Sequence, residues 1–198
     1  MYVHKNTIQV LKSRISQGDS AALGELYKTS YSSLLRFGVQ VHGAHQASLV
    51  EEQIQELFLW IAKNYNQLEQ IKNLEAYLFQ ALRKRLMQAH SNTLQRKKVK
   101  VRYHHRTSSA QSFIRNSVEQ DYLEAENQSE QVQKLYAAIQ GLAPQQRAIL
   151  HLRYFQGFDY EEIAEVLSLN QQVCRNYVHR AIKKLRKQIL VLKSTILF

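Results

Sequence analysis

Residues 142–187 read LAPQQRAILHLRYFQGFDYEEIAEVLSLNQQVCRNYVHRAIKKLRK, and this stretch predicts three short helices. Pro144 suits the first turn of the first helix, because its ring fixes φ and it has no N–H to leave unpaired. Gly157 interrupts the helical pattern, and Asp159 followed by Glu162 has the form of a capping box that starts the second helix. The last two helices therefore have the spacing of a helix-turn-helix.

The third helix of this stretch has one apolar face. Asn170, at the end of the turn 168–170, is a good N-cap, and small or apolar residues then recur at spacings of four, three and four. They are Cys174, Val178, Ala181 and Leu185. This spacing places them on one side of a helix, which we expect to be buried. We therefore interpret Cys174 as a small core residue and not as a reactive thiol.

The opposite face of the third helix carries amides and cations and no carboxylate. Its members are Gln171, Gln172, Arg175, Asn176, His179, Arg180 and Lys183. Amide and guanidinium groups can read base edges in a DNA major groove, whereas lysine mainly meets phosphate. A basic helix face is often only a solvated surface. Its position after a capped helix and a tight turn favours DNA binding here.

The composition of the whole chain favours an all-α fold built from two small helical domains. The 198 residues include one proline and six glycines, which indicates long helices with few turns. A formal charge of +11 favours a polyanionic partner, nucleic acid ahead of a membrane surface. No apolar run approaches the roughly 20 residues that span a bilayer, so we expect no membrane insertion.

The single cysteine and the N-terminal residues favour a reducing, cytoplasmic location. One cysteine excludes an intramolecular disulfide, and residues 1–19 lack the uninterrupted apolar core of a secretory signal. We find no catalytic motif, no phosphate-binding loop and no metal spacing, because His104 and His105 have no further ligand cluster. We expect no enzyme activity, no cofactor and no small-molecule substrate.

Helical periodicity also organises the N-terminal half, with helices expected over residues 7–16, 19–42, 47–65 and 73–98. The third of these has a core side made of Val50, Ile54, Leu57, Phe58 and Ile61. Its other side exposes Gln55, Glu56, Leu59 and Trp60 beside Glu52. Two interpretations stay open for Trp60: it packs on a neighbouring helix, or it anchors a protein partner.

The fourth of these helices begins a strongly basic window. Its apolar residues are Ala76, Leu78, Phe79, Leu82, Leu86 and Met87. Residues 76–118 contain ten lysines and arginines and no acidic residue, which gives a formal charge of +10. Charge of one sign is the footprint of phosphate binding, although a solvated basic helix end is the alternative.

The basic window leads into a segment that we interpret as a flexible linker. Residues 105–118 are polar without strong periodicity, and five acidic residues follow within 119–130. We therefore expect a domain over 1–95, a linker over 96–126 and a helix-turn-helix domain over 127–198.

Four segments together resemble bacterial RNA polymerase sigma factors of the extracytoplasmic-function group. GDSAALGELYKTSYSSLLRFG (18–38), VEEQIQELFLWIAKN (50–64) and IKNLEAYLFQALRKRLM (71–87) resemble region two of that family. Residues 142–187 resemble region four, which is the most specific match. The resemblance implies a protein that binds core RNA polymerase, reads the minus-10 and minus-35 promoter elements and directs transcription initiation.

The resemblance also implies roles for individual residues. Gln55, Glu56, Leu59 and Trp60 would dock on the polymerase. Lys72, Asn73 and Tyr77 would capture an unstacked minus-10 base, and Arg83, Lys84 and Arg85 would hold phosphates nearby. In the minus-35 major groove, the exposed face of the third helix would read the DNA. An anti-sigma protein is a further candidate partner.

The sequence departs from the family pattern at several positions, and two rival functions stay open. The usual tryptophan of region two is displaced to Trp60, and Ser168 replaces a common turn glycine, which is tolerable if its φ is not positive. The first rival is a stand-alone helix-turn-helix regulator that binds an operator as a dimer. The second is an interaction scaffold whose positive charge serves an acidic protein.

Overall fold

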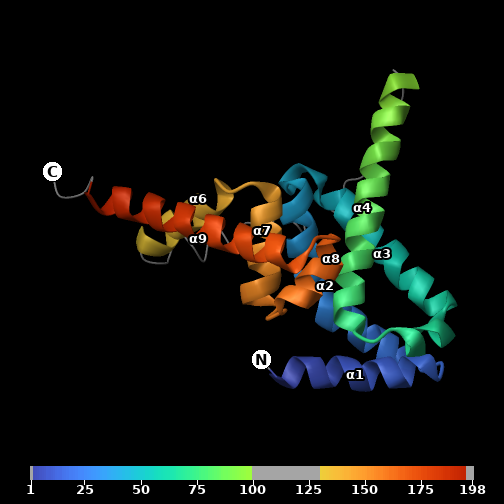
Figure 1. Cartoon of the computed structure of the whole chain (residues 1–198). Helices are drawn as coiled ribbons and strands as arrows, with labels where there is room; N and C mark the ends of the chain where they lie inside the picture. The colour runs from blue at the N-terminus through green and yellow to red at the C-terminus, as the bar shows by residue number, and fades with distance from the viewer. Residues whose placement is uncertain (1, 100–129, 195–198) are drawn as a thin grey trace.

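The computed structural model describes residues 2–99 and 130–194, and within these ranges every regular element is a helix (Figure 1). The N-terminal unit contains α1 (Tyr2–Ser16), α2 (Ser20–His42), α3 (Ala47–Lys63) and α4 (Leu74–Val99), with short 3-10 helices η1 (Ala44–Gln46) and η2 (Tyr65–Gln70). The C-terminal unit contains α6 (Glu130–Gln140), α7 (Pro144–Leu150), the π-helical turn η3 (His151–Phe155), α8 (Tyr160–Leu167) and α9 (Gln171–Ser194). The prediction of an all-α fold is confirmed.

Several boundaries differ from those expected. The first helix starts at Tyr2, and α4 continues through Val99, so residues 96–99 of the expected linker are helical. Residues 100–126 of that linker, with His104 and His105, lie outside the described residues. A loop was expected over residues 66–73. Instead, α3 ends at Lys63 with Asn64 as its C-cap, and Tyr65–Gln70 form the 3-10 helix η2.

The start of α2 follows from local capping chemistry. Asp19 accepts a hydrogen bond from the Ala22 N–H at 3.0 Å and lies 2.8 Å from the Arg14 guanidinium. The backbone hydrogen bond from Ala22 is the main cause that lowers the pKa of Asp19, and Arg14 adds to it. Gly18 precedes this cap with φ of +88°, a conformation that residues with a Cβ rarely adopt.

The predicted core face of α3 is confirmed, since Val50, Ile54, Leu57, Phe58 and Ile61 are all buried. Gly38 of α2 permits this close packing, because a Cβ there would lie 2.3 Å from a methyl carbon of Val50. On α4, five of the six apolar residues named from the sequence are buried, whereas Met87 is 51% exposed.

The helix-turn-helix forms as the sequence predicts. Asp159 accepts hydrogen bonds from the N–H groups of Glu161 and Glu162, and the Glu162 carboxylate accepts one from the Asp159 N–H at 2.8 Å. Asn170 caps α9 by accepting from the N–H groups of Gln172 and Val173. The capping box predicted from sequence is therefore present with both of its reciprocal bonds.

The turn between α8 and α9 does not meet the condition set for a serine at position 168, a φ that is not positive. Ser168 adopts φ of +53° and ψ of +48°, the left-handed helical region. This conformation ends α8, because it turns the N–H of the next residue, Leu169, back to the Ala164 carbonyl at a distance of 2.9 Å. The turn therefore retains the backbone geometry suited to glycine while carrying a side chain.

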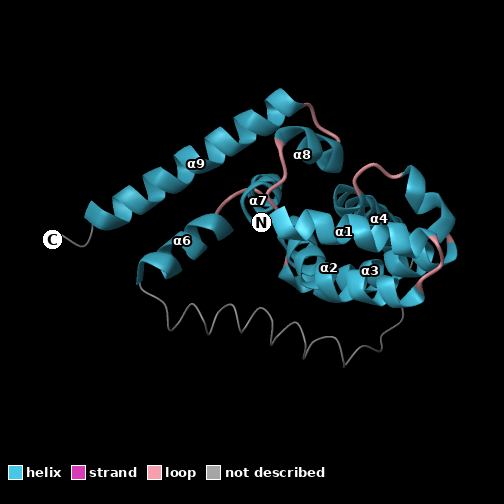
Figure 2. Ribbon diagram, turned by 90° about the horizontal axis from the view of Figure 1, so that it is seen from below, coloured by secondary structure: helices cyan, strands magenta, loops and turns pink. Residues whose placement is uncertain are grey.

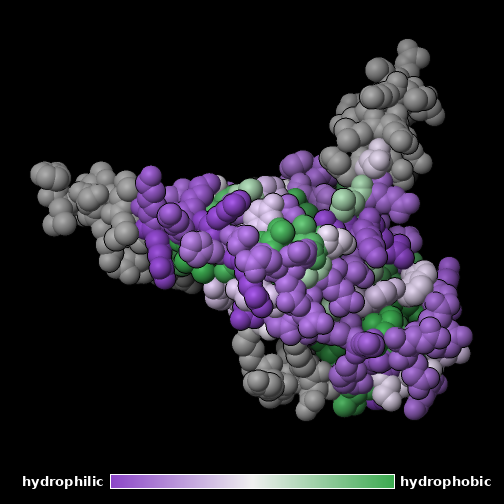
Figure 3. All heavy atoms as spheres, viewed as in Figure 1, coloured by the Kyte–Doolittle hydropathy of each residue, from purple (hydrophilic) through white to green (hydrophobic). Residues whose placement is uncertain are grey.

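The two helical units pack against each other through α2 and α4 on one side and α7 and α8 on the other. Figure 2 shows α7 and α8 lying between α9 and the bundle of α1 to α4. The buried residues of both units form one cluster, which includes Phe37, Phe79 and Phe158. The face seen in Figure 3 is mostly hydrophilic, with small separate hydrophobic areas. None of the described helices is both long and apolar enough to cross a membrane.

Candidate nucleic-acid interface

The seven amide and cationic residues of α9 are all exposed, as the helical spacing predicts. They are Gln171, Gln172, Arg175, Asn176, His179, Arg180 and Lys183. The opposite face is anchored in the core by Cys174, Val178 and Ala181, none of them more than 4% exposed. Burial also raises the pKa of the Cys174 thiol, so this cysteine is a packing residue. The helix thus presents a surface of hydrogen-bond donors and positive charge on a rigid support.

Tyr160, which the sequence interpretation overlooked, organises part of this surface. The Arg175 guanidinium carbon lies 5.4 Å from the centre of the Tyr160 ring, and that of Arg153 lies 4.8 Å from it. Arg153 is itself held by a hydrogen bond of 2.8 Å to the Phe158 carbonyl. Cations attracted to an aromatic face lose part of their freedom, so Tyr160 holds Arg175 in place. Helical periodicity could not find this contact, because Tyr160 and Arg175 belong to different helices.

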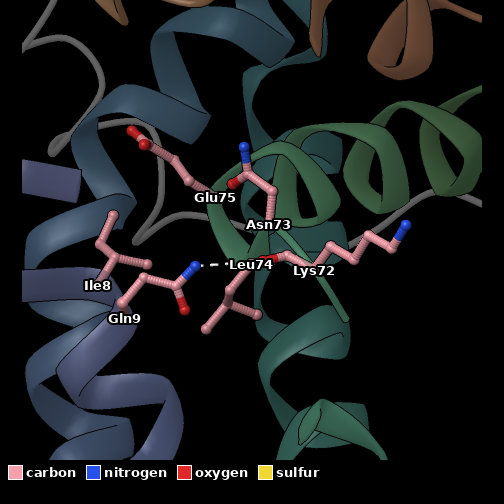
Figure 4. A pocket seen from close by; sticks show the side chains of 6 residues that line it. All are labelled: Ile8, Gln9, Lys72, Asn73, Leu74 and Glu75. Atoms are coloured by element: carbon pink, nitrogen blue, oxygen red, sulfur yellow. Dashed lines mark hydrogen bonds between the residues drawn. The ribbon is translucent and has the colours of Figure 1, made fainter. Parts of the chain in front are cut away.

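The residues expected to capture a minus-10 base surround the start of α4. A cavity of about 220 Å³ opens between Ile8 and Gln9 of α1 and residues 72–75 (Figure 4). The Gln9 side-chain amide donates a hydrogen bond of 3.1 Å to the Lys72 carbonyl, which ties α1 to this loop. Lys72 is exposed and its amine points away from the cavity, whereas Glu75 is buried. The cavity wall therefore combines apolar, amide and charged groups.

Asn73 is already engaged in two hydrogen bonds. Its side-chain oxygen accepts from the Ala76 N–H at 3.1 Å and so caps α4. Its side-chain nitrogen donates to the Glu162 carboxylate of α8 at 2.7 Å. The polar groups that would read a base are thus bonded within the protein in this arrangement.

Tyr77 and Trp60 lie side by side, with ring centroids 6.2 Å apart. Burial raises the pKa of Tyr77, and both residues are half-buried. Of the two interpretations of Trp60, the structure supports packing on a neighbouring helix. Gln55, Glu56 and Leu59 remain exposed on the outer side of α3, and Leu59 is 54% exposed.

The three cations of α4 differ in their surroundings. Lys84 is exposed, whereas Arg83 and Arg85 are half-buried, since consecutive helical residues point in different directions. Burial lowers the pKa of the Arg83 guanidinium, which nevertheless stays charged at neutral pH. The other seven cations of the expected basic window are residues whose side chains the structure does not describe. Among the residues that the structure describes, no group of three or more His, Cys, Asp or Glu side chains could hold a metal ion.

The structure therefore groups the predicted residues on three separate surfaces: the outer face of α9, the start of α4 and the outer side of α3. Trp60 and Tyr77, which come from different predicted sets, lie in contact. The surfaces of α9 and α4 suit a long anionic ligand, because each offers donors or cations beside a capped helix.

Comparison with known proteins agrees with this geometry. Residues 132–185 match the family described as sigma-70, region 4, and this range runs from within α6 through α7 and α8 into α9. One similar curated protein is the ECF RNA polymerase sigma factor SigX of Bacillus subtilis (strain 168), with 33% identity over 70 residues. That match spans 35% of this chain and 36% of the length of SigX. Residues 132–185 are thus similar to sigma-70 region 4, and a stretch of 70 residues is similar to part of one extracytoplasmic-function sigma factor.

Proposed function

We propose that this protein is a sigma factor that binds core RNA polymerase and directs promoter-specific transcription initiation. The observation that carries the proposal is the face of α9, where seven exposed amide, imidazole and cationic side chains lie within a region 4 domain. In the proposed complex this face enters the minus-35 major groove. Gln171, Gln172, Arg175 and His179 read base edges there. Asn176, Arg180 and Lys183 complete the contact, the two cations on phosphates.

The N-terminal unit supplies the other two contacts of the proposal. Residues 72–77 with Arg83, Lys84 and Arg85 engage the melted minus-10 strand, which is held by base contacts and phosphate pairing. On the outer side of α3, Gln55, Glu56 and the exposed Leu59 dock on the polymerase, and Trp60 stiffens this surface through Tyr77. The proposed role is non-enzymatic and is carried out in the cytoplasm, where promoter DNA and polymerase meet.

Run-off transcription with core enzyme tests the proposal directly. Genomic promoter fragments are transcribed with and without the purified protein, and new start sites preceded by shared minus-10 and minus-35 sequences are expected. If the protein produces no new start sites, it is not a sigma factor. Core polymerase alone and core polymerase with a Leu59→Glu variant serve as controls, and the variant is expected to co-purify poorly with polymerase.

A stand-alone helix-turn-helix regulator is the alternative that the α9 surface also fits. Such a protein would bind a palindromic duplex as a dimer without polymerase, with half-sites about one helical turn apart. The sigma proposal predicts weak duplex binding by the free protein. Gel-shift titration with and without core polymerase therefore separates the two functions. The alternative also leaves the exposed side of α3 without a function.

A further inference from the structure

We propose that α1 braces the minus-10 segment, residues 65–77, and that Gln9 is the positioning residue that holds Lys72 in place. This inference rests on the proposed function, because it concerns the segment that engages the melted minus-10 strand. It gives a role to α1, a helix to which the proposed function assigns no contact.

A buried face of α1 supports the minus-10 segment. Ile8, Leu11 and Ile15 recur at spacings of three and four residues, and each is at most 3% exposed. Leu68 of η2 is fully buried in the same cluster, and α1 packs against both η2 and α4. The segment therefore lies on a rigid support, because side chains in a packed core have little freedom to move.

The segment is held against α1 near two points. At one point the ring of Tyr65 lies against Gly18, where a Cβ would be 3.8 Å from a ring carbon. At the other point the Gln9 side chain reaches from α1 to Lys72, and its Nε2 donates to the Lys72 carbonyl oxygen at 3.1 Å (Figure 4). The chain between Tyr65 and Lys72 is thus fixed at both of its ends.

The hydrogen bond from Gln9 fixes a peptide group that lies between two helices. On one side, Ile71 is the C-cap of η2 and its N–H is bonded back to that helix. On the other side, Asn73 accepts an N–H from the first turn of α4. The Lys72 carbonyl belongs to the planar peptide that joins Lys72 to Asn73. Holding this oxygen therefore sets the directions in which both side chains leave the backbone.

Gln9 has the chemistry and the location that this role requires. A carbonyl oxygen only accepts hydrogen bonds, so the amide nitrogen of Gln9 must face Lys72. Gln9 is exposed, and its replacement leaves the buried face of α1 intact. With Ile8, it also lines the cavity of about 220 Å³ beside residues 72–75. Replacing Gln9 should therefore change the shape of the minus-10 segment more than the stability of the fold.

Hydrogen exchange of the free, full-length protein tests the bond itself. Gln9→Leu keeps a side chain of similar size and removes its donor. Gln17→Leu makes the same replacement at another exposed position, just after α1, and is the control. Peptides that cover residues 65–77 should exchange about threefold to tenfold faster in Gln9→Leu, as expected for the loss of one hydrogen bond. The control should exchange like the wild type.

Transcription with core polymerase tests the consequence for base reading. Promoters mapped with the wild-type protein are varied at single positions of the minus-10 or the minus-35 element, and pairs compete in one reaction. In Gln9→Leu, discrimination among minus-10 variants should fall about threefold to tenfold, because the segment is no longer held in one shape. Discrimination among minus-35 variants should stay within about twofold of wild type, since α9 is unchanged. A loss of folded protein would lower total transcription and change neither ratio.

The remaining outcomes overturn the inference. Unchanged exchange in Gln9→Leu would show that the bond does not hold the segment, and unchanged minus-10 discrimination would show that it has no role in reading. A change in discrimination without a change in exchange would mean that Gln9 contacts the DNA itself. If the wild-type protein produces no new start sites, the proposed function fails and this role of Gln9 fails with it. The exchange result, obtained without polymerase, does not depend on that outcome.

Discussion

The side chains of Asn73 and Glu162 join the N-termini of α4 and α8 by a hydrogen bond of 2.7 Å across the two helical units. Residues that are 89 positions apart thus share one bond while each caps its own helix. Each side chain therefore contributes both to the end of its own helix and to the contact between the two units. A change at Glu162 therefore affects the fold of α8 and the contact between units together.

Glu162→Ala should lower the free energy of unfolding by about 1–2 kcal/mol, because it removes half of the capping box and the acceptor for Asn73. Glu161→Ala is the matched control. Its side chain is exposed and only its backbone N–H meets Asp159, so the expected change is within about 0.5 kcal/mol. Urea denaturation of both variants measures the difference. Equal stabilities would show that the Glu162 carboxylate contributes nothing to the fold.

Arg175→Ala should weaken minus-35 recognition by about 1–3 kcal/mol, because a guanidinium that reads a base edge is lost. Arg186→Ala removes the same charge from an exposed position nearer the end of α9 and serves as the control. Competition between promoters that differ only in the minus-35 element provides the measurement. If promoter choice is unchanged in Arg175→Ala, Arg175 does not take part in reading the minus-35 bases.

Tyr160→Leu should reduce minus-35 discrimination by about 0.5–1 kcal/mol, since the aromatic face that attracts Arg175 disappears. Tyr160→Phe retains that face and should behave as wild type, which separates ring stacking from any role of the hydroxyl. The same promoter competition applies, with urea denaturation to confirm that both variants fold. If the phenylalanine variant loses as much as the leucine variant, Tyr160 acts through its hydroxyl group.

Ser168→Gly should raise the free energy of unfolding by about 0.5–1 kcal/mol. Glycine adopts the left-handed conformation of this turn without the steric penalty that a Cβ meets, and only part of this gain is lost to the greater freedom of the unfolded chain. Ser168→Ala keeps the Cβ and should change stability little. Thermal and urea unfolding compare the three proteins. A glycine variant less stable than wild type would mean that the Ser168 side chain stabilises the turn.

His151 should make the fold sensitive to acid. Burial, together with a smaller effect of the Arg36 charge, lowers the pKa of His151 to about 4. The folded state therefore binds fewer protons than the unfolded state between about pH 6.5 and 4, so stability falls as the pH drops through this window. The contribution of His151 to this loss reaches up to about 2 kcal/mol at pH 5.

Urea denaturation at pH 7.5 and pH 5 measures the effect of His151. His151→Phe should flatten the pH dependence, because phenylalanine cannot take up a proton and its ring can pack beside Phe37 and Phe155. His179→Ala, at an exposed position, should retain the wild-type dependence. If His151→Phe loses as much stability between pH 7.5 and pH 5 as the wild type does, other groups cause the acid sensitivity.

Much of the α9 surface and of the helix boundaries was predictable from short-range patterns. A capping box spans four residues and a helical face repeats every three or four, so Asp159, Glu162 and Asn170 mark their helices without knowledge of the rest of the chain. The burial of Cys174 and the exposure of Arg175 follow from the same periodicity. Periodicity does not predict burial everywhere. Met87 is exposed, because an apolar side chain on a long helix is buried only where a neighbouring element covers it.

By itself, the sequence determined the all-α class, the helix-turn-helix and the residues on the outer face of α9, since local backbone preferences and helical spacing decide these features. Tertiary structure alone decided that Trp60 packs on Tyr77, that Tyr160 holds Arg175 and that Glu162 reaches Asn73. Each of these contacts joins side chains from different helices. Their distances depend on how the helices pack, and no periodicity within one helix contains that information.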